Sequence, residues 1–188
     1  MGVQMGRVFF KSALCVAAAF LYSASASALD VASDDMLCPL ESISESEMEA
    51  WSPTLSANKG QLNDAQLDRL VSVVLECGQK LGWSEDDGAS ALELHMAILG
   101  GTALSENLLA NGVNAEYYET VLQDRSAQEL EQILTDPDNS PALVQLAELM
   151  IENLGSDLND QIAGDLGTYI AFTAQSRYST MKMMGLAN

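Results

Sequence analysis

The stretch from Asn63 to Trp83 constrains the fold most, because it combines a helical pattern with one of the chain's three cysteines. Apolar side chains recur along it every three or four residues, which is the spacing of one face of an α-helix. Asn63 suits the first position of a helix and Gly82 suits a left-handed helix end. We therefore predict a helix around which the rest of the chain packs, with Trp83 folded back onto its last turn. Its buried face consists of Leu67, Leu70, Val71, Val73, Val74, Cys77 and Leu81.

The first 28 residues have the layout of a Sec-type signal peptide. Arg7 and Lys11 precede an apolar run over residues 13–22, and small residues follow up to Ala28. The run is about ten residues long, whereas a membrane span needs about twenty. We expect cleavage after Ala28, a periplasmic or secreted location, and no membrane span in the mature chain. An irregular N-terminal arm over residues 29–43 and a single helical domain over residues 44–188 should follow.

The chain is strongly acidic, with 27 acidic and 8 basic residues and a net charge of −19. Removing the leader makes the mature chain still more negative, because the leader holds two basic residues and no acidic one. This charge argues against a nucleic-acid partner, which would require a basic surface. The acids are spread along the chain, so we interpret them mainly as a solvated surface. A basic protein partner is the alternative, and no pattern indicates an oligomeric state.

The mature chain keeps two cysteines, Cys38 and Cys77, because Cys15 belongs to the leader. An even count in an exported protein predicts a disulfide bond, and two buried free thiols are the alternative. In the chain-entropy model, closing a loop of about 40 residues is worth about 4 kcal/mol. A redox or metal role is less favoured, since the cysteines do not form a Cys-x-x-Cys pair and no histidine lies nearby in the sequence.

Helical signals also dominate the rest of the chain, and no segment alternates as a strand does. Ser44, Ser84, Ser126 and Ser140 mark helix starts at the expected positions. We therefore predict an all-α fold, an irregular orthogonal bundle of about six to eight helices.

Several breaker residues carry further expectations about helix ends and crossings. Pro53 should end the helix that starts after Ser44, and Gly100 with Gly101 should stop or kink the helix that starts after Ser84. Gly164 and Gly167, in the last helix, are expected to mark close helix crossings.

No catalytic, cofactor-binding or metal-binding residue can be named from the sequence. His95 is the only histidine, and we interpret it as a satisfied, partly buried residue because no activated nucleophile accompanies it. The acids do not single out a catalytic carboxylate pair. The turn at residues 136–140 begins like a calcium loop, but Pro141 replaces the glycine that such a loop requires.

The C-terminus carries a cluster of flexible apolar side chains formed by Tyr178, Met181, Met183 and Met184. Because methionine adapts to irregular surfaces, this cluster is the preferred partner surface if it is exposed. The favoured hypothesis is an exported, non-enzymatic helical protein that acts through protein contacts, as a structural, chaperone-like or inhibitor-like module. One alternative is an enzyme acting on envelope glycans through an unidentified carboxylate pair, and another is a calcium-stabilised protein.

Overall fold

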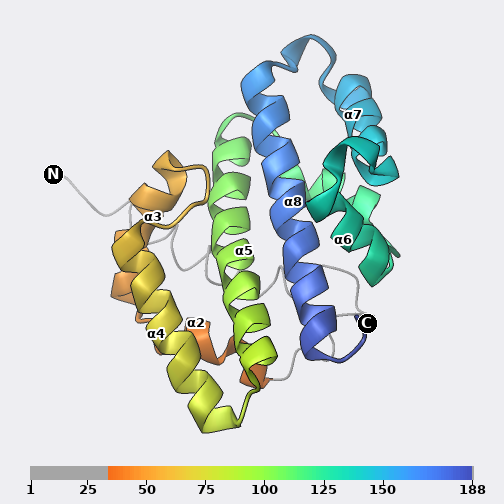
Figure 1. Ribbon diagram of the computed structural model, residues 1–188. Coiled ribbons are helices and arrows are strands. Elements are labelled where there is room, and N and C mark those ends of the chain that lie inside the picture. Colours follow the sequence, from red (N-terminus) through yellow and green to blue (C-terminus); the bar gives the residue numbers. More distant parts are fainter. Residues whose placement is uncertain (1–33, 188) are drawn as a thin grey trace, which may run out of the picture.

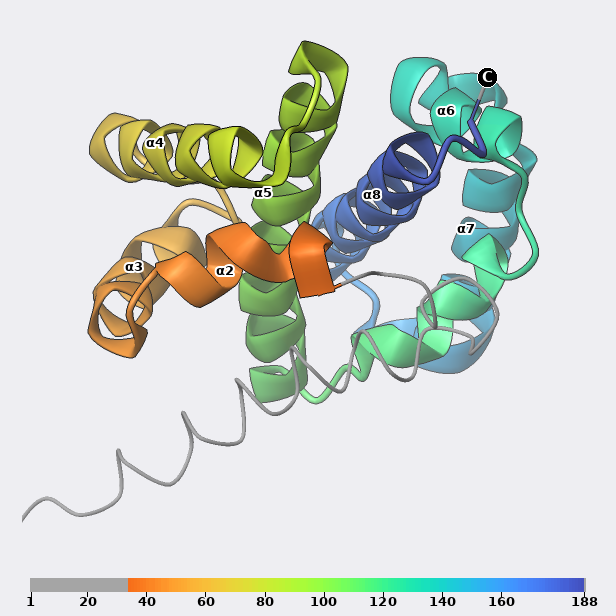
Figure 2. The same cartoon turned by 90° about the horizontal axis from the view of Figure 1, so that it is seen from below.

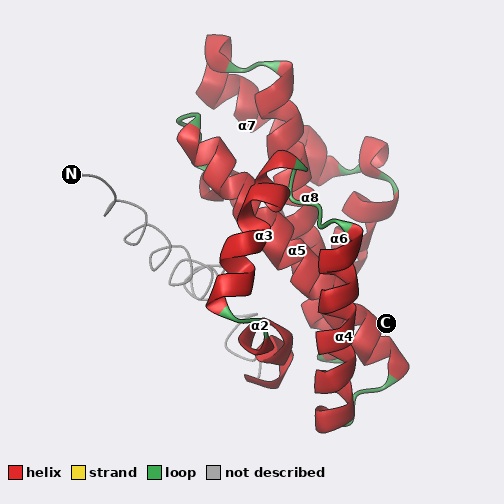
Figure 3. Cartoon of the chain, turned by 90° about the vertical axis from the view of Figure 1, so that its left-hand side faces the viewer, coloured by secondary structure: helices red, strands yellow, loops and turns green. Residues whose placement is uncertain are grey.

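The structure is a computed structural model that describes residues 34–187. Over this range the fold is all-α, with helices joined by short loops and without strands, as predicted (Figure 3). The proposed signal peptide, residues 1–28, lies outside the described residues. The elements are η1 (Asp34–Leu37), α2 (Cys38–Ser42), α3 (Glu45–Ala57), α4 (Asp64–Leu81), α5 (Glu85–Ala110), η2 (Ala115–Leu122), α6 (Ala127–Thr135), η3 (Pro137–Asn139), α7 (Pro141–Leu154), η4 (Gly155–Asp157) and α8 (Asp160–Met183), where η denotes a 3-10 helix.

Helices α5 and α8 run side by side through the middle of the molecule (Figure 1). Helices α2, α3 and α4 lie on one side of this pair, whereas α6 and α7 lie on the other (Figure 2). The prediction that the chain packs around Asn63–Trp83 is therefore wrong. That segment is an outer helix because only one of its faces is apolar, whereas α5 buries side chains nearly all round.

Two apolar cores lie on either side of the central pair. The N-terminal core consists of Ile43, Trp51, Leu55, Leu70, Val73, Val74, Cys77, Ala91, Leu99 and Ala103. The C-terminal core consists of Leu104, Leu108, Val113, Ala115, Tyr118, Val121, Leu122, Leu130, Ile133, Ala142, Leu146, Met150, Leu166, Tyr169, Ile170 and Ala174. Helix α5 contributes side chains to both cores, so it joins the two halves of the molecule.

The local signals of α4 behave as the sequence predicts. The Asn63 side chain accepts a hydrogen bond from the Gln66 backbone N–H at 3.0 Å, and the Gln66 side-chain oxygen accepts one from the Asn63 backbone N–H at 3.0 Å. Gly82 has φ of 75°, a left-handed conformation that closes the helix at little cost for a glycine. Ser44, Ser84 and Ser126 also cap their helices as expected.

The structure corrects two predictions about where helices form and end. Residues 34–42 of the expected irregular arm are helical. Pro39 lies in the first turn of α2, where N–H groups have no partner within the helix, so its missing N–H costs no helical hydrogen bond. Pro53 does not end α3, which continues to Ala57. Trp51 and Leu55 are both buried on either side of Pro53, so packing holds the helix together across it.

The close helix crossing lies at glycines other than those the sequence indicated. Gly100 and Gly101 do not stop α5, which continues to Ala110. Gly100 packs against the Gly60 backbone and the Phe172 ring. A Cβ atom on Gly100 would lie 2.6 Å from Phe172 Cζ and 2.8 Å from the Gly60 oxygen. By contrast, Cβ atoms on Gly164 and Gly167 would meet nothing within 4 Å, so their expected crossing is wrong.

Candidate functional site

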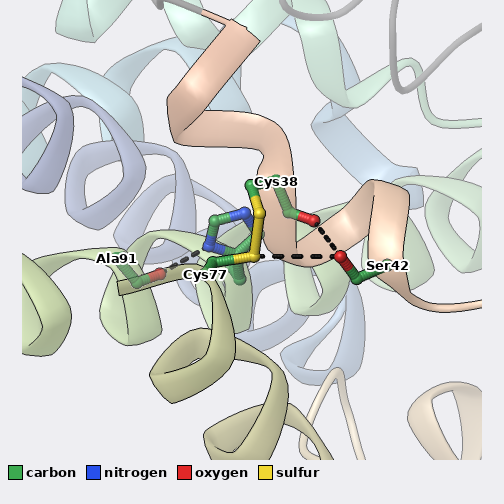
Figure 4. Close-up of a disulfide and its surroundings, with 5 residues drawn as sticks. Cys38, Ser42, Cys77 and Ala91 are labelled. Carbon is green, nitrogen blue, oxygen red and sulfur yellow. Dashed lines mark hydrogen bonds between the residues drawn. A yellow bond between two sulfur atoms is a disulfide. The ribbon is translucent and has the colours of Figure 1, made fainter. Parts of the chain in front are cut away.

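The Cys38–Cys77 disulfide is present, as predicted, and joins α2 to α4 with a Cα–Cα distance of 6.1 Å. Ser42 lies beside it, donating a hydrogen bond to the Cys38 carbonyl at 2.8 Å and approaching Cys77 Sγ at 3.8 Å (Figure 4). Cys77 is buried, whereas Cys38 is half-buried. The bond therefore fixes the first described segment of the chain onto α4.

His95 is fully buried in α5, deeper than the partly buried position that the sequence analysis expected. Its Nδ1 lies 2.6 Å from the Ala91 carbonyl, and its Nε2 has no hydrogen-bond partner among the described residues. Burial lowers the pKa of His95 to about 4, while the backbone groups of Ala91 and Met36 offset part of this effect. The imidazole is therefore neutral at pH 7, and its Nδ1–H donates to a backbone carbonyl instead of activating a nucleophile.

A polar network that the sequence analysis missed joins η2 to α8. Tyr169 Oη donates a hydrogen bond to Glu119 Oε1, and Arg177 approaches Glu119 Oε2 at 3.5 Å. Arg177 also donates to the Leu122 carbonyl at 3.0 Å, which caps the end of η2. The side chains of Arg177 and Glu119 are 16% and 14% exposed, so solvent screens their attraction only weakly.

Two groups of this network, Glu119 and Tyr169, have pKa values above their usual ranges. Burial raises the pKa of Glu119, although the hydrogen bond from Tyr169 and the charge of Arg177 oppose the rise. Burial and the neighbouring carboxylate of Glu119 raise the pKa of Tyr169. Because each group binds another member or the backbone, we interpret the network as a clamp between η2 and α8. Sequence spacing could not reveal it, since 50 residues separate Glu119 from Tyr169.

The C-terminal cluster predicted as a partner surface is half-buried in the structure. Tyr178 and Met181 pack against the C-terminal core, and Met183 packs against the N-terminal core. Lys182 lies over the Tyr178 ring at 5.7 Å, and Met184 is also half-buried. These side chains cover the end of the central pair, and their role as a partner surface stays a prediction.

A groove lies between α4 and α5, and its lining is mostly apolar. It has a volume of about 410 Å³. In Figure 2 α4 runs across the direction of α5, and the loop at residues 82–84 joins the two helices. We name this surface the α4–α5 groove. It is lined by Val71, Val74, Leu75, Gly78, Gln79, Trp83, Ser84, Glu85, Gly88, Ala89 and Leu92.

Backbone hydrogen bonds at the end of α4 position Trp83 in the lining of the α4–α5 groove. The N–H groups of Gly82 and Trp83 both donate to the Gly78 carbonyl, at 2.8 and 3.0 Å. This turn brings Trp83 over Gly78, where a Cβ atom would lie 3.5 Å from Trp83 Cε3. The predicted return of Trp83 onto the last turn of α4 therefore places an aromatic wall in the groove.

The groove is flanked by large exposed apolar side chains and by acids. Leu75 is 60% exposed, and Met96, one turn beyond Leu92, is 37% exposed. Glu85 belongs to the lining, and the neighbouring Asp86 is exposed. The groove can therefore hold an apolar group and attract positive charge near it.

The described residues lack two further features, a cluster of metal-binding side chains and a transmembrane helix. Within residues 34–187, His, Cys, Asp and Glu side chains do not form a group of three that could hold a metal ion. None of the helices in the described part of the chain has the length and apolar character of a transmembrane segment.

Comparison of the chain with protein-family models, curated proteins and solved structures found no match.

Proposed function

We propose that this protein is exported and acts through protein contacts instead of catalysis, with the α4–α5 groove as its contact surface. The observation that supports the proposal is the exposed Leu75 at the edge of an apolar groove of about 410 Å³. An apolar concave surface is the usual form of a binding site, and large apolar side chains at its edge favour a macromolecular partner.

The lining of the groove also argues against the glycan-hydrolase alternative at this position. Hydrolysis of a glycosidic bond generally uses two carboxylates at a set separation, whereas Glu85 is the single carboxylate in the lining. His95 points its Nδ1 to Ala91 inside the protein, so it is not a general base for this groove.

Export follows from the leader and is consistent with the disulfide, which persists in oxidising compartments. The test is the intact mass of the protein recovered outside the cytoplasm of an expressing bacterium. We expect a chain lacking residues 1–28 and two hydrogens lighter because of the disulfide. Recovery of the full-length chain in the cytoplasm would contradict export.

The contact surface can be tested by placing a benzophenone amino acid at position 75 and irradiating living cells that express the full chain. The matched control carries the same group at position 151, because Ile151 is 65% exposed on α7, far along the chain from the groove. We expect a discrete protein adduct from position 75 and none from position 151. Adducts at neither position, or equal adducts at both, would contradict the groove as the contact surface.

A further inference from the structure

The α4–α5 groove is open along one side, so its occupant must extend beyond it. Its volume of about 410 Å³ suits a few side chains. Leu75, in the lining, is 60% exposed, and Met96, one helical turn beyond the lining residue Leu92, is 37% exposed. An amphipathic helix fits such a surface, since it presents apolar side chains at i, i+3, i+4 and i+7 to a groove between helices. Met96 adds an adaptable contact for such a row of side chains.

The charge around the groove selects among helical occupants. Helix α5 contains no lysine or arginine, and its first turn carries three acids, of which Glu85 lines the groove. On α4, Lys80 lies in the last turn, whereas Arg69 pairs with Glu47 of α3. The acids outnumber this single lysine, so the rim favours an occupant with positive side chains at its edges.

We propose, building on the proposed function, that the occupant of the α4–α5 groove is an amphipathic helical segment of a partner protein, with bulky apolar anchors flanked by lysine or arginine. Trp83 and Leu92 in the lining provide apolar contacts for the anchors, and Glu85 in the lining, with the exposed Asp86 next to it in the chain, provides negative charge. A second copy of this chain is disfavoured as occupant, because it would bring the same acids and a net charge of −19 to the contact.

The proposal can be tested with a synthetic 16-residue peptide that places leucines on one helical face and lysines beside them. Two control peptides have the same composition in scrambled order, or glutamate in place of lysine. Binding is followed by the fluorescence of Trp83 in a Trp51→Phe protein, because Trp51 and Trp83 are the two tryptophans of the chain. We expect saturable binding of the first peptide and at least tenfold weaker binding of both controls.

Matched variants separate groove binding from general attraction to an acidic protein. Leu75→Ser should weaken binding about tenfold, because it removes an apolar contact on the groove edge. Ile151→Ser, on the exposed face of α7, should leave binding unchanged. The pair Glu85→Gln and Asp86→Asn should weaken binding several-fold and reduce its salt dependence, whereas Glu148→Gln with Glu152→Gln on α7 should have a much smaller effect.

Three outcomes would overturn the proposal. The first is that the scrambled or the acidic peptide binds as tightly as the amphipathic basic one. The second is that the α7 variants weaken binding as much as the groove variants. The third is that a long-chain fatty acid binds in the groove more tightly than the peptide. An adduct at position 75 in cells together with any of these outcomes would leave the proposed function standing and reject this class of occupant. Absence of that adduct would instead reject the proposed function.

Discussion

The two halves of the molecule are held to the central helix pair by different means. In the N-terminal half, a covalent bond joins α2 to α4, and the outer helices leave an open apolar groove. In the C-terminal half, the packed core around η2, α6 and α7 is completed by the Glu119, Tyr169 and Arg177 clamp. The disulfide therefore supplies stability that the N-terminal half would otherwise obtain by burying more apolar surface. A groove can then stay open for a partner.

Removing the disulfide should have the largest effect on stability. The double variant Cys38→Ser with Cys77→Ser should lose about 4 kcal/mol of unfolding free energy, because the bond closes a loop with a sequence separation of 39. Urea denaturation measures this loss, and the wild-type protein in excess dithiothreitol serves as the matched control. An unchanged urea midpoint in the variant would show that packing alone holds the N-terminal half.

Breaking the clamp should be the second largest effect and should depend on pH. Arg177→Met should cost about 3 kcal/mol at pH 7, because it leaves the Glu119 carboxylate buried without its positive partner. The folded-state pKa of Glu119 is already raised and should rise further, so protonation as the pH falls towards 5 removes part of the penalty. Arg69→Met is the control, because Arg69 and Glu47 are 37% and 38% exposed, so solvent screens their attraction and the pair should contribute little to stability. Equal costs for the two variants would contradict the clamp.

The buried His95 should lower the free energy of unfolding in mild acid. Its pKa is about 4 in the folded protein, below the usual histidine value of 6.5, so the unfolded chain binds a proton first as the pH falls. Stability should therefore fall between pH 6.5 and pH 4, by about 3 kcal/mol from this residue. Urea denaturation of the wild type and of His95→Gln at pH 7 and pH 4.5 measures the difference. The same pH dependence in both proteins would show that other groups control it.

A pair of glycine substitutions should give the smallest effects, with opposite signs. Gly100→Ala should destabilise the protein by about 2 kcal/mol, because the added methyl group meets the Gly60 carbonyl, which is backbone and cannot move aside cheaply. Gly164→Ala should stabilise it by about 1 kcal/mol, since α8 has open space there. Thermal unfolding of both variants measures the shifts. Two variants with shifts of the same sign would contradict the crossing at Gly100.

Features that depend on neighbouring residues in the chain could be predicted from the sequence. The capping box at Asn63 and Gln66, the left-handed Gly82 and the folded-back Trp83 all follow from contacts within a few residues. The disulfide could also be predicted, because one of the three cysteines falls in the predicted leader and the other two can pair. One wall of the candidate groove was therefore within reach of local reasoning.

Features that depend on residues far apart in the chain could not be predicted. Gly60, Gly100 and Phe172 meet at one crossing although they are widely separated in the sequence. The apolar pattern of α4 indicated a buried face, but not that α4 would lie outside the central pair and leave Leu75 exposed. Pro53 shows the same limit, because tertiary packing of α3 overrides a local preference for a break.

The sequence by itself determined the all-α class, the helix starts and the sulfur pairing, since periodicity, capping and cysteine count act locally or by elimination. Only the tertiary structure decided which helices are central, which glycines touch and where Glu119 finds Arg177. The physical reason is that burial and charge pairing depend on distances through space, which neighbours in the chain do not specify.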